Sequence, residues 1–104
     1  MNSYKDISTA LSAIGLIKLI HYHQTIDKNS PNILVTKQTI KAIYANAPNK
    51  RGIALTIDLL IQEGALKRIS GNDIDDDDFC CELVNYKKLD EIAKNLRDIR
   101  DAKY

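Results

Sequence analysis

A chain of 104 residues, 44% of them hydrophobic, is long enough for a single domain (residues 1–104) with one modest core. Its 15 basic and 14 acidic residues leave a formal net charge of +1, which excludes neither a nucleic acid nor a protein as partner. No stretch approaches the ~20 consecutive apolar residues of a membrane span, and residues 1–6 lack a charged-then-apolar export signal. We therefore expect a cytoplasmic protein with no membrane partner.

The first predicted element is a long helix over about residues 6–23. Ile7, Leu11 and Ile14 recur at helical spacing, and the apolar residues within 16–20 then widen the stripe. A helix that is apolar on most sides should be buried on most sides. Two interpretations follow: this is the central core helix of a monomer, or a second copy of the chain covers part of it in a homodimer.

Two further helices are predicted in the middle of the chain, over about residues 37–45 and 50–63. A turn at 27–32 and a brief β-prone run at 33–35 precede them. Gly64 follows the second helix, where a left-handed residue typically ends a helix. Two helices joined by a short turn form a helix-turn-helix.

Two short strands, at about residues 65–70 and 79–84, are predicted after that glycine, with a polar, acidic turn between them. A final helix is predicted over about residues 88–102. Four of its apolar residues have the alternating three-and-four spacing of a coiled-coil seam: Leu89, Ile92, Leu96 and Ile99. This helix either packs on its own domain or pairs with a second copy, in which case these four residues form the dimer contact.

The order of helix, glycine stop, strand, loop and returning strand resembles the winged helix-turn-helix superfamily. The resemblance covers about residues 6–86 and is carried by the helix end Leu60–Gly64 and the strand Ala65–Ile69. It implies a mainly α fold with a small β-wing, extended here by a long N-terminal helix and a C-terminal helix at about 88–102. It also implies that the chain binds a macromolecule, although many unrelated activities occur on this fold.

Charge is distributed unevenly along the chain. Between Lys37 and Arg68, six basic and two acidic residues give +4, whereas six acidic residues between Asp73 and Glu82 give −6. In winged helices that read DNA, the second helix of the helix-turn-helix enters the major groove, and the resemblance implies a wing along the neighbouring backbone. The candidate DNA-binding residues are Lys37, Lys41, Lys50, Arg51, Thr56, Lys67 and Arg68.

Two features of the same region favour a protein partner instead. The helix at 50–63 is rich in leucine and isoleucine, whereas base reading requires Arg, Lys, Asn or Gln on that helix. The acidic run at 75–78 would be repelled by DNA phosphates. The candidate partner-binding residues are Leu55, Leu59, Asp75, Asp76, Asp77 and Asp78.

Two functional hypotheses remain. The first is a small winged-helix protein that binds double-stranded DNA, a dimeric transcription regulator. The second is an adaptor whose apolar third helix and acidic wing dock on another protein. For the second, the stretches Ala54–Leu60 and Gly64–Leu66 look like the small winged-helix subunits of chromosome-maintenance-type ATPase complexes, including those in phage defence.

Metal and catalytic motifs are not found. Residues 73–77 resemble the start of a calcium loop, but Asp78 and Val84 occupy the positions that require glycine and a bidentate acid. Four zinc-type ligands occur in two pairs: His21, His23, Cys80 and Cys81. Within each pair the side chains diverge, which disfavours a shared site and leaves the cysteines as free thiols. Without a phosphate loop or nucleophile motif, we expect no enzyme activity, cofactor or small-molecule substrate.

Overall fold

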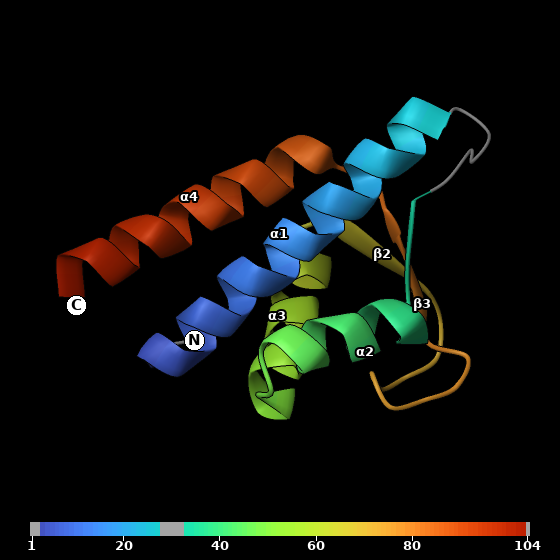
Figure 1. The fold of residues 1–104 in the computed structure, drawn as a ribbon, viewed down its shortest axis with the longest axis horizontal. Helices are drawn as coiled ribbons and strands as arrows, with labels where there is room; N and C mark the ends of the chain where they lie inside the picture. The colour runs from blue at the N-terminus through green and yellow to red at the C-terminus, as the bar shows by residue number, and fades with distance from the viewer. Residues whose placement is uncertain (1–2, 28–32, 104) are drawn as a thin grey trace.

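The computed structural model describes residues 3–27 and 33–103 (Figure 1). Within them the chain forms these elements: α1 (Tyr4–Asp27), β1 (Leu34–Thr36), α2 (Lys37–Asn46), α3 (Lys50–Gln62), β2 (Leu66–Ser70), β3 (Cys80–Leu83) and α4 (Tyr86–Lys103). The fold is therefore mainly helical with a small antiparallel sheet, as the sequence predicted. The turn expected at 27–32 lies, from residue 28 on, outside the described residues. None of the described helices is both long enough and apolar enough to cross a membrane.

All four predicted helices are confirmed, with ends that differ by a few residues. The helix α1 starts two residues earlier than predicted and continues to Asp27, and α4 begins at Tyr86 instead of 88. The two strands predicted after Gly64 are also confirmed, at 66–70 and 80–83. The β-prone run near residue 34 is a true strand, β1, that enters the same sheet.

The sheet has the order β1-β3-β2, and both pairs are antiparallel. The strand β3 is central because Cys81 lies opposite Val35 on one side and Arg68 on the other. The pairing shifts between Arg68 and Ser70, so Ile69 has no partner in the register and is 54% exposed. Since β1 leads directly into α2, the sheet fixes the position of α2 relative to the loop between β2 and β3.

The helix α1 is at the centre of the core. It contacts α2, α3 and α4, and it crosses the molecule between α4 and the α2–α3 pair (Figure 1). Ile7, Ile14 and Ile17 are buried, whereas Leu19 and Tyr22 near its C-terminal end are 50% and 61% exposed. Most of the broad apolar stripe is thus covered by the chain itself.

The helix α4 packs along α1 through the residues of the expected seam. Leu89, Ile92 and Leu96 are 0–6% exposed, which means they belong to the core of their own domain. The ion pair between Lys18 and Asp90, at 2.5 Å, joins the same two helices. The predicted dimer contact is corrected accordingly: of its four residues, Ile99, 40% exposed, is the one that a second copy could reach.

Two glycines, one on each side of β2, allow the backbone geometry of this region to be tested. Gly64 and Gly71 both have a positive φ, of 82° and 78°. A Cβ at Gly64 would have no neighbour within 4 Å, whereas one at Gly71 would lie 2.8 Å from the Cα of Phe79. Gly64→Ala should therefore cost only the left-handed strain of about 1–2 kcal/mol. Gly71→Ala should cost clearly more, because the Phe79 backbone must also move. Equal losses in urea unfolding would contradict this geometry.

Candidate functional site

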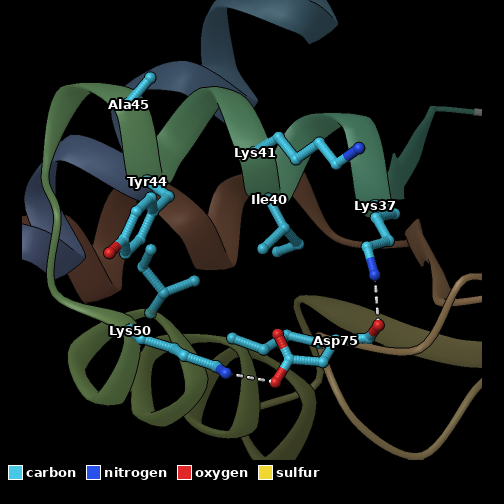
Figure 2. Close-up of a pocket in the computed structure, with 9 residues that line it drawn as sticks. Lys37, Ile40, Lys41, Tyr44, Ala45, Lys50 and Asp75 are labelled. Atoms are coloured by element: carbon cyan, nitrogen blue, oxygen red, sulfur yellow. Dashed lines mark hydrogen bonds and ion pairs between the residues drawn. The ribbon is translucent and has the colours of Figure 1, made fainter.

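The loop between β2 and β3 folds onto the N-terminal ends of α2 and α3. Residues 72–78 are called the acidic loop below. The Nζ atom of Lys50 lies 2.5 Å from Oδ2 of Asp75. The ammonium group of Lys37 donates to the backbone carbonyl of Asp75 and lies 3.2 Å from Oδ1 of Asp77. Asp75 is thereby held between lysines from two helices, as Figure 2 shows.

The acidic loop has its own internal structure, which explains why it turns inward. The carboxylate of Asp76 accepts hydrogen bonds from the backbone N–H groups of Asn72 and Asp73, at 2.8 and 3.0 Å. These backbone bonds hold the pKa of Asp76 below its usual range. Ile74 and Phe79, 5% and 2% exposed, anchor the loop and its C-terminal end in the core. The two apolar anchors thus direct part of the acidic run toward the protein.

Arg51 is also paired within the chain, with the buried Asp6 in the first turn of α1. Its Nη1 atom lies 3.1 Å from Oδ2 of Asp6. The amide of Asn49 donates to the other oxygen of Asp6 at 3.0 Å and to Thr9 at 3.1 Å. Asn49 also caps α3, because its side-chain oxygen accepts from the N–H of Gly52. The sequence reasoning missed Asp6, since nothing in the local pattern connects it to a residue 45 positions away.

Two more of the candidate DNA-binding residues, Arg68 and Thr56, have partners within the chain. The side chain of Arg68 lies 3.8 Å from the Asp58 carboxylate. Thr56 is fully buried, and its hydroxyl donates to the carbonyl of Gly52 at 2.7 Å, so Thr56 cannot enter a DNA groove. This corrects the prediction for Thr56, which shares the inward face of α3 with Ile53 and Leu60.

The remaining basic candidates, Lys41 and Lys67, are exposed. Lys67 lies opposite Glu82 in the register of β2 and β3. Lys41 makes no ion pair within the described part of the chain. Of the six predicted basic residues, four therefore have a carboxylate partner on the same chain: Lys37, Lys50, Arg51 and Arg68.

The predicted partner-binding residues lie on two separate surfaces. Leu59 lines a groove of about 200 Å³ between α3 and α4, together with Leu96 and Ile99. Lys88 bridges the rim of this groove, with its Nζ atom 3.4 Å from Glu91 and 3.8 Å from Glu63. Leu55, one turn earlier on α3, is half-buried. The acidic loop instead lines a different hollow, with α2 and the first turns of α3.

Comparison with known proteins identifies no relative: no family model, no curated protein and no solved structure matches the chain. Among the described residues, no group of three or more His, Cys, Asp or Glu side chains is placed to hold a metal ion. Cys80 and Cys81 are both free thiols, and burial raises the pKa of Cys81 above its usual range.

The buried Asp6 should make stability depend on pH in the acid range. The hydrogen bond from Asn49, supported by Ser3 and the Arg51 charge, lowers the pKa of Asp6 below 3.8. A carboxyl group whose pKa is lowered by folding stabilises the folded protein when the pH is above its unfolded-state pKa. This contribution is lost as the pH falls through the folded-state pKa. Asp6→Asn should therefore destabilise the protein at pH 7, and this deficit should shrink as the pH falls through the folded-state pKa of Asp6. A series of urea unfolding curves from pH 7 into the acid range tests this, with the exposed Asp98→Asn as control. A deficit of the same size at every pH would exclude the proposed ionisation.

Proposed function

We propose that this chain is a winged helix-turn-helix domain that binds another protein rather than duplex DNA. The order of elements supports the winged-helix assignment: helix, strand, two helices, a hairpin and a closing helix. The sheet order β1-β3-β2 supports it too, because the strand before the helix-turn-helix pairs with the second strand of the hairpin. On this assignment α3 is the helix that would read DNA, and the acidic loop is the tip of the wing.

The observation that favours a protein partner is that four basic residues pair with carboxylates of the same chain. These residues, called the basic face below, are Lys37, Lys50, Arg51 and Arg68. A phosphate contact at Lys37 or Lys50 would have to replace Asp75 and Asp77 of the wing itself. A contact at Arg51 would compete with the buried Asp6, whose other oxygen remains bound to Asn49. Affinity for DNA comes largely from counterion release at free lysines and arginines. Internal carboxylates in these positions remove much of that contribution.

The outer side of α3 has the composition of a surface that contacts protein. Leu55 and Leu59 lie one turn apart and are half-buried. The exposed Asp58 between them in the sequence pairs with Arg68. Beside them, the groove between α3 and α4 continues to Ile99. Protein interfaces combine such apolar anchors with a polar rim. Here the rim consists of Glu63, Lys88, Glu91 and Asn95.

A DNA-binding regulator remains a second candidate because of the exposure of the ion pairs that mask the basic face. The side chains of Lys50 and Asp75 are 63% and 54% exposed. Ion pairs of this kind typically contribute about 0–1 kcal/mol, so a duplex could displace the acidic loop if other contacts favoured binding. Lys41 would then add a cation that has no acidic partner in the described residues.

Photo-crosslinking in cells that produce the protein tests the proposed surface. p-Benzoylphenylalanine in place of Leu55 should give one discrete adduct with another protein. The same group in place of the exposed Ser8 on α1 serves as the matched control. Ile99→Glu, introduced together with the Leu55 probe, should remove the adduct because it puts a charge into the groove. Adducts of equal yield at both positions, or crosslinks from position 55 to DNA, would reject the proposal.

A further inference from the structure

A second hollow, of about 480 Å³, lies between α2, the first turns of α3 and the acidic loop (Figure 2). Its apolar lining includes Ile40, Ile53 and Ile74, which are 0–7% exposed. The ring of Tyr44, 51% exposed, extends from α2 toward Lys50 and forms one wall. Small-molecule sites commonly have volumes of about 300–1,000 Å³, an apolar lining and a few converging polar groups. The hollow has all three properties.

The polar groups around this hollow include both signs of charge. Three lysines line it: Lys37, Lys41 and Lys50. The ammonium groups of Lys37 and Lys50 point toward the acidic loop, where Asp75 contacts Lys50 and Asp77 contacts Lys37 (Figure 2). The side chain of Lys41 lies along α2 instead, and it makes no ion pair among the described residues. The hollow therefore presents an apolar surface beside a lysine, Lys50, that already holds a carboxylate.

We propose that this hollow binds a small organic carboxylate that carries an apolar body. The ligand carboxylate would take the position of the Asp75 carboxylate beside Lys50, and its apolar body would lie on the isoleucines. The chain already shows that a carboxylate is accepted there, at 2.5 Å from the Lys50 ammonium group. This site is separate from the groove between α3 and α4, so it does not depend on the proposed protein partner.

Asp75 acts in this arrangement as an internal competitor of the ligand. Its side chain is 54% exposed and rests on a loop that is anchored independently by Ile74 and by the hydrogen bonds to Asp76. The Asp75 carboxylate can thus leave Lys50 without unfolding the loop. Exchange of one carboxylate for another changes the electrostatics little, so burial of the apolar body would drive binding.

A titration followed by 1H–15N NMR tests the site with defined probes. Benzoate, hexanoate and indole-3-acetate should each shift the signals of α2, the first turns of α3 and the acidic loop in a saturable manner. Their neutral amides should bind at least about fivefold more weakly, the effect of one partly exposed ion pair. Inorganic phosphate, which has charge but no apolar body, should give no saturable shift in these segments. If phosphate saturates the site as the carboxylates do, it is an anion site only and the proposal fails.

Two variants of the acidic loop distinguish the loss of the competing Asp75 carboxylate from a change in the net charge of the loop. Asp75→Asn removes the competing carboxylate and should tighten carboxylate binding about fivefold. Asp78→Asn makes the same change of charge in the same loop, but its carboxylate is exposed and pairs with no lysine of the hollow, so binding should stay nearly constant. The proposal is overturned if neither the wild type nor Asp75→Asn saturates by about 10 mM, a Kd too weak for a specific site. It is equally overturned if both variants tighten binding alike, or if the amides bind as tightly as the acids.

Discussion

Leu60→Ala should lower the free energy of unfolding by about 2–5 kcal/mol, the range for large-to-small changes in a packed core. Leu60 is fully buried near the end of α3, where it belongs to the same apolar cluster as Ile57 and Ile14. A domain of this size has a total stability of about 5–15 kcal/mol. The substitution therefore removes a large fraction of it, and urea unfolding followed by circular dichroism will show the shift.

The neighbouring Leu59 provides the matched control, because it is the same residue type in the same helix. Leu59 is half-buried and lines the groove between α3 and α4. Leu59→Ala should cost about 1–2 kcal/mol, since only part of its side chain is removed from water. If the two alanine variants lose equal stability, Leu59 is a core residue and is not an accessible contact residue of the groove.

Leu96→Glu should lower the free energy of unfolding by about 3–5 kcal/mol. Leu96 is 5% exposed and belongs to the core, and none of its described neighbours in the groove besides Lys88 is a cation. An uncompensated buried charge of this kind typically costs several kcal/mol. Ile99→Glu, one turn later and 40% exposed, should change the unfolding free energy by only about 0.5 kcal/mol. Similar stabilities for these two variants would show that α4 does not pack as described.

The Ile99→Glu variant also tests the predicted homodimer. Wild-type protein at micromolar concentration should sediment at twice the chain mass of 11.7 kDa. Ile99→Glu should then sediment as a monomer with its fold intact, because Ile99 is the seam residue that the core leaves accessible. A wild type that is monomeric under these conditions would end the dimer hypothesis.

The helices and the wing could be predicted from the sequence because each depends on local signals. Apolar spacing of three and four marks the inward face of α3, and Gly64 ends it with a positive φ. The strand β1 was harder to predict as part of the sheet. Its three residues gain their hydrogen bonds from β3, which is 46 positions later in the chain.

The apolar residues of α4 show that periodicity cannot predict which helix a seam packs against. Leu89, Ile92 and Leu96 have the spacing that a partner helix would need, but α1 of the same chain satisfies the same requirement. Thr56 shows a second limit. A polar residue in a helix suggests the surface, yet the hydroxyl of Thr56 is satisfied by the Gly52 carbonyl one turn earlier, which lets it enter the core.

The charge pattern was visible in the sequence, but its pairing was not. The number of lysines and aspartates follows from composition, whereas the contact of Lys50 with Asp75 depends on where Ile74 and Phe79 anchor the loop. Tyr44 and Ile74, which line the hollow between α2, α3 and the acidic loop, were likewise missed. Neither belongs to a motif, and the hollow exists only after α2, α3 and the acidic loop come together.

Titration of random-sequence duplex DNA at physiological salt tests most directly whether the basic face is masked by its own carboxylates. If it is masked, the Kd should lie above about 100 µM, weaker than ordinary non-specific binding. The combined change Lys50→Ala and Arg51→Ala should then leave this weak binding nearly unchanged. Masking would be contradicted by a micromolar Kd that weakens steeply with salt, together with a salt slope that the double variant lowers by about two phosphate contacts.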